Sequence, residues 1–479
     1  MPRRTKIVGT LGPATDPPDV LAAVIAAGLD VARINFSHGN EAEHLGRVAA
    51  LRAAALKAGR VVAVLADLPG PKLRVKIAGP RQLAPGDVLH FTTATVPAGD
   101  DIGITEPEVL PDVRPGQRML LDDGKLQLTA GDFRDGRLAA TVTVGGTLQQ
   151  NKGLNLPDTP LTIASVTDRD HAALKVAAKA GCDWVAVSFV RGPEAADAVR
   201  AACAAVGLYV PVMAKVERPE AVRRMGDIVR AFDAIMVARG DLGVETAFEE
   251  LPVVQKQLIA EARRAGKPVV TATEMLDSMR LNPRPTRAEA SDVANAIFDG
   301  SDAVMLSGEL AIGHYPVETV ACMARIAEKA EEHLEGMGRG YGGAEVCGVA
   351  GDVDDPMAVA ACDLADKVGA TAIVTPTLSG RTARLLARCR PWARIVAPAP
   401  TSAVVRRMAV VWGVRPLLMT PLSPGESRLV SSVRDAFGAG VLAAGERVVV
   451  LAGHPLEAGP RLPTLRVVRV GEGGTSLEP

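Results

Sequence analysis

Short β-branched segments alternate with alanine-rich helical segments over most of the chain, and this alternation restricts the fold more than any other feature of the sequence. Several of the β-branched segments stop at a glycine or a polar residue, as strands do. A strand followed by a helix, repeated eight times, predicts an α/β fold with a closed parallel (β/α)8 barrel. The predicted strands are residues 7–10, 31–35, 61–67, 184–189, 212–215, 234–237, 269–273 and 303–306.

The helical segments between these strands carry start and stop signals. Thr167 is followed three residues later by Asp170, which is typical of a capping box, and Gly181 marks the expected end of that helix. Thr286 and Glu289 repeat the starting pattern before a later helix.

The third strand is followed by a segment of different composition, which interrupts the strand–helix alternation from about residue 70 to about residue 160. Proline–glycine, aspartate–glycine and glycine–glycine pairs separate short alternating segments there, as in a small antiparallel β domain or β-barrel. An insertion at the carboxyl end of a barrel strand lies over the active face. We therefore predict a lid domain at 70–160, inserted into a catalytic barrel made of 1–69 and 161–335.

A second α/β alternation follows a glycine-rich linker at 336–343. Its predicted strands are 372–375, 395–397, 447–452 and 465–470. We expect a separate C-terminal α/β domain at 344–479.

Charge and composition exclude several kinds of partner. The 479 residues contain 54 lysines plus arginines and 55 acidic residues, so no net field favours nucleic acid or an anionic membrane. No signal-peptide core and no apolar run of about 18 residues is present, so we expect a cytoplasmic protein with a small-molecule substrate. The six cysteines lack metal-ligand spacing, which argues against a disulfide framework or a zinc site.

Polar residues stand at the carboxyl ends of the predicted barrel strands, where they would converge on one mouth. Glu217 and Asp241 follow neighbouring strands and could together hold a Mg²⁺ that leaves positions for substrate oxygens. Taken singly, Lys215 and Glu217 also fit a solvated strand end, and Asp241 also fits a helix cap. Their convergence with further polar strand ends is what favours an active site.

Two further candidates keep an alternative interpretation. Arg33 suits a phosphate group, and a salt bridge at the barrel rim explains it equally well. The segment Gly240-Asp241-Leu242-Gly243 could open a short helix that binds a substrate carboxylate, or it could form a left-handed turn. We assign His38 no acid–base role.

Five segments of the chain resemble hallmark segments of pyruvate kinase, and the resemblance runs from about residue 4 to about residue 330 and more weakly to the end. They are TKIVGTLGPA at 5–14, VARINFSHG at 31–39, MVARGDLGVE at 236–245, PRPTRAE at 283–289 and MLSGE at 305–309. The resemblance implies a TIM barrel, an inserted β lid and a regulatory C-terminal domain in a homotetramer. It implies the last step of glycolysis, in which phosphoenolpyruvate and ADP give pyruvate and ATP.

The resemblance also implies roles for particular residues. Glu217 and Asp241 would bind Mg²⁺ or Mn²⁺, Lys215 would stabilise charge on the phosphoryl group and the enolate, and Arg33 would hold the phosphate. Thr273 would lie where the enolate is protonated, and Gly240 would donate to the substrate carboxylate. The implied nucleotide contacts are Asn35, His38, Arg74 and Lys152. Such a set suits phosphoryl transfer, which needs positioning and charge neutralisation rather than a covalent nucleophile.

A monovalent-cation site is a further implication, formed by the side chains of Asn35, Ser37 and Asp67 and the carbonyl of Leu68. Relatives that need K⁺ usually have an acidic residue where this chain has Lys72. A tethered ammonium could supply the charge of K⁺, so we expect a K⁺-independent enzyme. A lysine that faces solvent is the alternative. Glu274 replaces a common glutamine, and we have no account of it.

The C-terminal domain contains a possible effector loop. Thr377, Ser379, Gly380, Arg381 and Thr382 follow a predicted strand and open a helix, so they could cradle a phosphate, and the family uses a similar loop for a phosphorylated effector. A capped turn without a ligand explains the same residues.

Two other functions compete with phosphotransfer. A metal-dependent aldolase or lyase that acts on pyruvate would need neither the lid nor the nucleotide contacts, so binding of ADP discriminates against it. A catalytically silent scaffold would retain the fold without activity.

Overall fold

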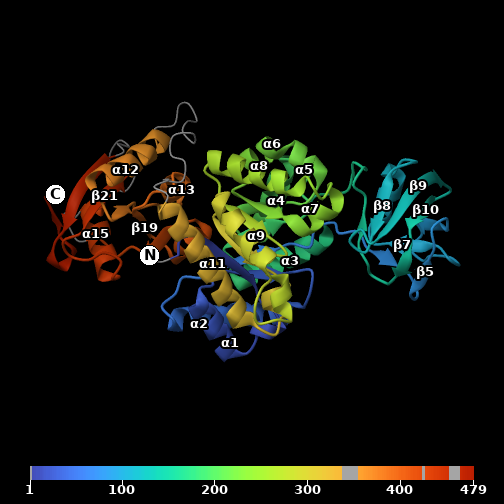
Figure 1. Ribbon diagram of the computed structural model, residues 1–479, viewed down its shortest axis with the longest axis horizontal. Helices are drawn as coiled ribbons and strands as arrows, with labels where there is room; N and C mark the ends of the chain where they lie inside the picture. Colours follow the sequence, from blue (N-terminus) through green and yellow to red (C-terminus); the bar gives the residue numbers. More distant parts are fainter. Residues whose placement is uncertain (1–2, 337–353, 423–426, 453–463, 479) are drawn as a thin grey trace.

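The computed structural model describes residues 3–336, 354–422, 427–452 and 464–478 of the chain. Figure 1 shows three units in a row, with the barrel in the middle, a β lid on one side and the C-terminal domain on the other, beside the N-terminus. The predicted linker at 336–343 lies, apart from Gly336, outside the described residues.

The central unit is a closed barrel of eight parallel strands, which confirms the predicted fold class. The strands are β1 (Lys6–Thr10), β2 (Val31–Asn35), β3 (Ala63–Asp67), β13 (Trp184–Val187), β14 (Val212–Val216), β15 (Ala234–Ala238), β16 (Val269–Ala272) and β17 (Ala303–Leu306). Each pairs with the next one along the chain, and β1 closes the ring against β17. The lid is inserted between β3 and β13, which pair directly.

Helices cover the outside of the barrel. They are α1 (Pro18–Ala27), α2 (Glu41–Lys57), α3 (Asp168–Ala180), α4 (Glu194–Ala205), α5 (Pro219–Arg223), α6 (Met225–Ala231), α7 (Arg239–Glu245), α8 (Leu251–Arg264), α9 (Arg287–Phe298), α10 (Gly308–Ala311) and α11 (Pro316–Gly336). Both predicted capping boxes are present, and Gly181 ends α3 in the left-handed conformation. Each capping side chain satisfies a backbone N–H that the helix cannot pair itself.

Two predicted strands end earlier than the sequence indicated. The structure ends β13 at Val187 and β16 at Ala272, because Phe189 and Thr273 have φ angles of +55° and +70°. A left-handed residue cannot continue a strand and is costly for a side chain other than glycine. The β-branched and apolar residues of these segments favoured longer strands, and the positive φ angles themselves leave no trace in the sequence.

The lid is a seven-stranded sheet that is mostly antiparallel, together with a two-stranded sheet. The larger sheet contains β4 (Val75–Lys76), β6 (Val88–Thr92), β7 (Ile102–Ile104), β8 (Arg118–Leu121), β9 (Leu126–Arg134), β10 (Arg137–Val144) and β12 (Leu154–Asn155). The smaller sheet pairs β5 (Arg81–Leu83) with β11 (Gly146–Leu148). A bridge between Arg74 and Gly153 brings the ends of the larger sheet together, so the sheet is nearly closed.

The C-terminal domain has a six-stranded sheet in the order β20-β19-β18-β21-β22-β23. Its strands are β18 (Ala372–Val374), β19 (Arg394–Ala399), β20 (Val414–Leu418), β21 (Arg447–Ala452), β22 (Thr464–Val470) and β23 (Ser476–Leu477). Its helices are α12 (Asp354–Val368), α13 (Arg381–Arg388), α14 (Ser402–Arg407) and α15 (Arg428–Gly438). The sequence did not predict β20 or β23. Pro416 obscures β20, and a proline is tolerated there because β20 is an edge strand.

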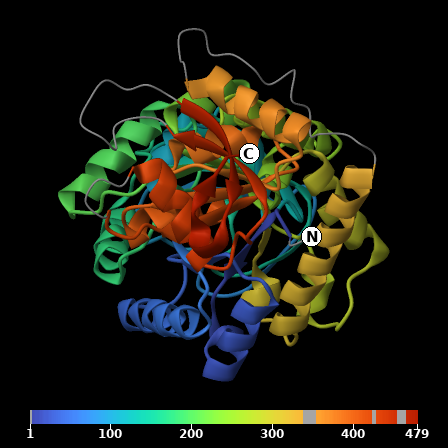
Figure 2. The ribbon, with the colours of Figure 1, turned by 90° about the vertical axis from the view of Figure 1, so that its left-hand side faces the viewer.

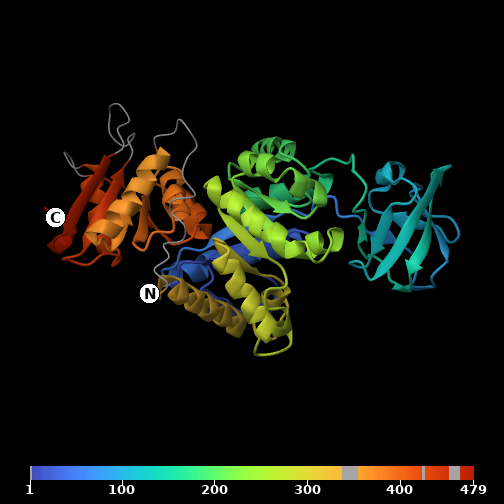
Figure 3. The same cartoon turned by 45° about the horizontal axis from the view of Figure 1, so that its top comes forward.

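The C-terminal domain covers the amino-terminal end of the barrel, as Figures 2 and 3 show from two further directions. Trp184 of β13 donates its indole N–H to the carbonyl of Arg407 at 3.0 Å, and Lys6 of β1 donates to the carbonyl of Val414 at 2.9 Å. Apolar side chains inside the barrel, including Val8 and Met213, belong to the same buried cluster as side chains of the C-terminal domain. The opposite, carboxyl end of the barrel is the end from which the lid extends.

The five cysteines in the described part of the chain are buried and free. No described helix is long and apolar enough to cross a membrane.

Candidate active site

Lys215 lies at the centre of a charged network in the carboxyl mouth of the barrel. Its ammonium group is 2.9 Å from Oε1 of Glu217 and 3.3 Å from Oδ1 of Asp67, and it donates to the hydroxyl of Ser188 at 2.7 Å. Glu217 directly follows β14, Asp67 is the last residue of β3 and Ser188 directly follows β13, so parallel strand ends bring the three partners together. Only 11% of the Lys215 side chain is exposed.

The charges in this network favour the ionised forms of Lys215 and Asp67. Burial by itself would lower the pKa of Lys215, but the negative charges of Asp67 and Glu217 outweigh burial and raise it. Burial would likewise raise the pKa of Asp67, but Lys215 and Arg33 outweigh it and lower that pKa. Lys215 is therefore a permanent positive charge at neutral pH.

Glu217 and Asp241 are the two carboxylates at this mouth that fit a divalent metal ion. They follow β14 and β15, which are neighbours in the barrel. The Oε2 atom of Glu217 accepts from the backbone N–H of Phe189 at 2.7 Å, and this bond accounts for the left-handed backbone of Phe189. No group of three or more histidine, cysteine or acidic side chains is arranged to hold a metal within the described ranges. Two carboxylates completed by substrate oxygens are a set that Mg²⁺ accepts.

Lys72 reaches the same mouth from the segment that leads into the lid. Its ammonium group lies 2.8 Å from Oδ1 of Asp241 and 6.0 Å from the centre of the Phe189 ring. The lysine is therefore partnered in the site and does not simply face solvent, with 29% of its side chain exposed.

Gly240 and Thr273 are joined directly. The N–H of Gly240, in the first turn of α7, donates to the hydroxyl of Thr273 at 2.7 Å. Arg239 stabilises the backbone at Thr273, whose φ is positive, because it donates to the carbonyls of Ala272 at 3.2 Å and of Thr273 at 2.7 Å. The hydroxyl of Thr273 and the start of α7 are thus positioned as one unit.

Arg33 makes the rim ion pair that was the alternative interpretation of this residue. Its Nε lies 2.5 Å from Oδ2 of Asp67, and its Nη1 donates to the hydroxyl of Thr10 at 2.8 Å. The ion pair also places the guanidinium beside the Lys215 network. A phosphate-binding role for Arg33 is compatible with this position.

The residues predicted for a monovalent cation include one member of this network and others at or just after the ends of β2 and β3. Asp67 belongs to the network itself, and the carbonyl of Leu68 accepts from the hydroxyl of Ser188 at 2.7 Å. The side-chain oxygen of Asn35 accepts from the N–H of Ser37 at 3.0 Å.

The proposed nucleotide contacts are divided between the mouth and the lid. His38 is exposed at the mouth. The pKa of its imidazole is lowered by partial desolvation and by four nearby positive charges, those of Arg74, Arg33, Lys72 and Arg169. These cations make the surroundings of His38 attractive to an anion. In the lid, Arg74 donates to the carbonyl of Asn151 at 2.8 Å, and Lys152 lies 2.8 Å from Oδ1 of Asp122.

The effector candidates form a turn between β18 and α13. The hydroxyl of Thr377 accepts from the N–H of Gly380 at 3.0 Å, and Gly380 caps α13 with a φ of +80°. Arg381 is paired with Asp354, and the carbonyl of Ser379 accepts from Arg384 at 3.4 Å. Thr382 lies in the first turn of α13. The capped turn is thus present, and effector binding stays a prediction.

Three residues that contribute to the mouth were not predicted from the sequence. Ser188 bonds to Lys215 but was included in the predicted strand 184–189. Arg169 contributes to the positive field at His38, and Phe189 binds Glu217 through its backbone. A polar residue directly after a buried strand was the available signal for Ser188; backbone contacts such as that of Phe189 leave no trace in a sequence.

Comparison with known proteins agrees with this architecture. Residues 2–320 match the model of the pyruvate kinase barrel domain, and residues 355–468 match that of the pyruvate kinase alpha/beta domain. Pyruvate kinase 2 of Synechocystis is 44% identical over 462 residues, which cover 95% of this chain and 77% of that protein. The pyruvate kinase of Geobacillus stearothermophilus is 42% identical, with 95% of this chain and 78% of the relative covered. That of Mycobacterium intracellulare is 40% identical, and 98% and 99% are covered.

The fold, the charged mouth and these matches define a barrel-based phosphotransferase. The chain belongs to the pyruvate kinase family.

Proposed function

We propose that this enzyme transfers the phosphoryl group of phosphoenolpyruvate to ADP and releases pyruvate and ATP. The observation that carries the proposal is the buried ammonium of Lys215 between Asp67 and Glu217, at the mouth that also holds Asp241. A fixed positive charge in a desolvated mouth suits a migrating phosphoryl group, whose negative charge must be offset.

The proposed roles are those that the resemblance to the family implies, and the position of each residue at the barrel mouth supports them. Lys215 offsets charge on the phosphoryl group and then on the enolate oxygen, and Arg33 holds the phosphate. The N–H of Gly240 binds the substrate carboxylate, so its bond to Thr273 is exchanged when substrate arrives. The hydroxyl of Thr273 then lies beside the enolate carbon that takes up a proton. A Mg²⁺ or Mn²⁺ ion held by Glu217 and Asp241 would supply further positive charge to the phosphate oxygens.

For the nucleotide, we propose contacts from Asn35 and His38 at the mouth and from Arg74 and Lys152 in the lid. The positive field at His38 supports this assignment, because ADP is an anion. In this scheme Arg74 and Lys152 give up their bonds within the lid when the nucleotide phosphates bind.

A coupled assay tests the activity directly. Pyruvate release should require phosphoenolpyruvate, ADP and a divalent ion together. Pyruvate formed at the same rate without ADP would favour a lyase. A wild-type protein that binds Mn²⁺ but forms no pyruvate in this assay would contradict the proposal.

We further propose that turnover does not require K⁺, because the ammonium of Lys72 already places a monovalent positive charge in the mouth. Activity should be the same in buffers of bulky organic cations and of K⁺. A many-fold rise on addition of K⁺ would contradict this.

We also propose that the protein is a cytoplasmic homotetramer, and analytical ultracentrifugation tests the oligomeric state.

We further propose that a phosphorylated effector regulates the enzyme through the turn before α13, which contains Thr377, Ser379, Gly380, Arg381 and Thr382. Sugar phosphates or AMP should lower the phosphoenolpyruvate concentration for half-saturation, and the variants Ser379→Ala and Thr382→Ala should abolish that response.

A further inference from the structure

A buried polar cluster joins the lid to the barrel at the segment by which the chain returns from the lid. Arg218, directly after β14, donates through Nη2 to the carbonyls of Leu156 at 3.1 Å and Thr159 at 3.2 Å. Its Nη1 lies 3.2 Å from both carboxylate oxygens of Glu245. Asn155, the last residue of β12, donates its side-chain N–H to Oε1 of Glu245 at 2.9 Å.

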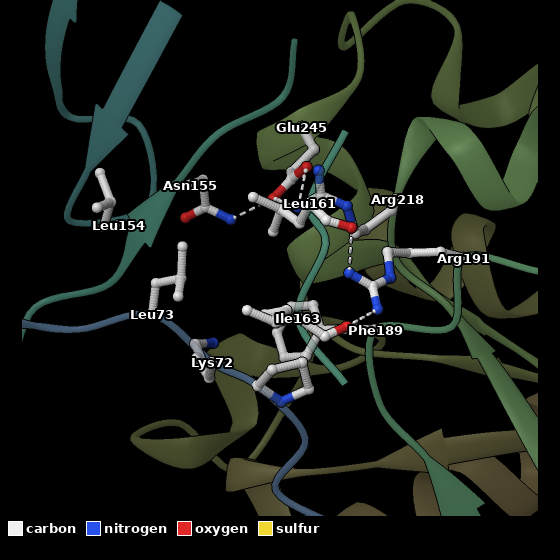
Figure 4. Close-up of a pocket in the computed structure, with 11 residues that line it drawn as sticks. Lys72, Leu73, Leu154, Asn155, Leu161, Ile163, Phe189, Arg191, Arg218 and Glu245 are labelled. Carbon is white, nitrogen blue, oxygen red and sulfur yellow. Dashed lines mark hydrogen bonds and ion pairs between the residues drawn. The ribbon is translucent and has the colours of Figure 1, made fainter. Parts of the chain in front are cut away.

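Figure 4 shows these side chains together, with Asn155 pointing across from the lid toward Glu245 and Arg218 beside it. Arg191, which follows β13, adds a bond of 2.7 Å to the carbonyl of Leu161. The cavity enclosed here has a volume of about 20 Å³. That is space for about one water molecule, so the place is a packed junction and not a ligand site.

Burial makes these contacts hard to exchange. Arg218 and Glu245 are each 3% exposed, and Asn155 is 7% exposed. A buried charge that loses its partner is strongly destabilising, because water cannot replace the partner. Above about pH 7, where the Glu245 carboxyl is ionised, the return segment of the lid is therefore tied to a buried ion pair of Arg218 and Glu245.

Glu245 connects this junction to the catalytic mouth. It is the last residue of α7, the helix that begins with Arg239, Gly240 and Asp241. Glu245 and Asp241 are four residues apart in a helix, so both side chains lie on the same face. A single short helix, about 10 Å long, thus carries a lid contact at its last residue and a proposed metal ligand in its first turn.

We propose that Asn155, Arg218 and Glu245, which we call the hinge clamp, are positioning residues that couple the orientation of the lid to the position of α7. Movement of the lid is transmitted through the Asn155–Glu245 bond to Gly240 and Asp241, and substrate or metal bound at α7 biases the lid in return. The expected effect of the clamp on activity rests on the proposed phosphotransfer. The coupling between the lid and α7 does not depend on that proposal.

Hydrogen exchange in the free, full-length protein tests the coupling without any chemistry. Asn155→Ala removes the lid-side donor and leaves the Arg218–Glu245 pair in place. A hydrogen bond to a buried charge corresponds to roughly a tenfold change or more in an equilibrium constant. We expect the amides of 239–245 in α7 to exchange about tenfold faster in Asn155→Ala.

The matched control is Thr147→Val, which removes a 2.7 Å bond to Gln82 within the lid. Exchange in α7 should be unchanged in this control. If Asn155→Ala speeds exchange only in β12 and leaves α7 as in wild type, the clamp holds the lid strand alone and the proposed coupling is wrong.

A second set of variants, in which the hydrogen-bond donor and acceptor at positions 155 and 245 are swapped, tests the coupling if Asn155→Ala folds poorly. Asn155→Asp preserves size but sets two carboxylates against each other, and we expect faster exchange in α7. The double variant Asn155→Asp/Glu245→Gln reverses donor and acceptor but also takes the Glu245 charge away from Arg218, which keeps Glu220. Exchange in α7 should therefore be slower than in Asn155→Asp without reaching the wild-type rate. Exchange no slower in the double variant than in Asn155→Asp would overturn the proposal.

Steady-state kinetics supplies a second readout. Asn155→Ala should lower kcat/KM for ADP about tenfold, and the control Thr147→Val should leave it unchanged. If wild type shows no phosphotransfer, the proposed function fails while hydrogen exchange still decides the clamp. If wild type is active and kcat/KM is unchanged in Asn155→Ala although α7 loosens, the coupling is present but plays no part in turnover.

Discussion

The ammonium of Lys72 lies 2.8 Å from Oδ1 of Asp241, so the segment entering the lid is bonded to the helix that carries a proposed metal ligand. A cation arriving at Asp241 meets this positive charge and competes with it for the same oxygen.

Removal of the Lys72 charge should therefore tighten divalent binding in the absence of substrate. We expect Lys72→Met to bind Mn²⁺ about three- to tenfold more tightly than wild type, as measured by electron paramagnetic resonance of free Mn²⁺. The control is Lys152→Met, which removes a lysine paired with Asp122 and not with Asp241. Weaker Mn²⁺ binding in Lys72→Met would show that the lysine assists the metal instead.

Lys215 should be needed for both catalysis and stability. Lys215→Met is expected to lower kcat by at least about a hundredfold, because the charge that offsets the phosphoryl group is lost. It also leaves Asp67 and Glu217 buried without their shared partner, which should cost about 3 kcal/mol in urea unfolding. Ser188→Ala keeps every charge and should cost only about 1 kcal/mol. Equal losses in the two variants would argue against the electrostatic explanation.

Thr273 should separate activity from stability. Its φ of +70° is unfavourable for a β-branched residue, so Thr273→Gly relieves backbone strain while losing the bond from Gly240. We expect the free energy of unfolding to change by less than about 1 kcal/mol and kcat to fall about a hundredfold or more. Thr273→Ser keeps the hydroxyl and should stay within about tenfold of wild-type kcat. Full activity in Thr273→Gly would remove Thr273 from the proposed protonation step.

Glu245 should make stability depend on pH in a specific direction. Burial, opposed by Arg218, raises the pKa of this carboxyl from 4.5 to about 7. Between these values the folded protein holds a proton that the unfolded chain has lost. The stabilising contribution is therefore complete below about pH 4.5 and is lost as the pH rises through about 7.

Glu245→Gln removes this titration. Between about pH 5.5 and about pH 8.5, its free energy of unfolding should rise relative to wild type by about 2 kcal/mol. Chemical denaturation at both pH values measures the difference, and groups common to both proteins cancel. The exposed Glu249, changed to Gln, is the matched control and should show no such trend. A constant difference between Glu245→Gln and wild type would contradict the assigned pKa.

The architecture was predictable because periodicity and strand-end chemistry are local properties of the sequence. Eight strand–helix repeats specify a barrel, and the polar residues after the strands necessarily meet at one end of it. That is why Lys215 and Asp67 could be expected to share a site before any coordinates. The capping boxes at Thr167 and Thr286 were predictable for the same reason.

Contacts between distant segments were not predictable. The Lys72–Asp241 and Asn155–Glu245 pairs join residues 169 and 90 positions apart, and no local pattern reports such a distance. Positive φ angles at Phe189 and Thr273 arise from tertiary hydrogen bonds, so the strands were extended too far. The edge strand β20 was hidden by a proline that only its place in the sheet makes acceptable.

The buried cluster shared by the barrel interior and the C-terminal domain limits how this protein can be divided. A chain truncated after α11 would leave Val8, Trp184 and Met213 near an open tube end in water, and such a fragment should aggregate. The C-terminal domain thus shields the amino-terminal end of the barrel interior from water, whether or not it binds a ligand. Correct folding of the catalytic barrel therefore depends on the presence of the C-terminal domain.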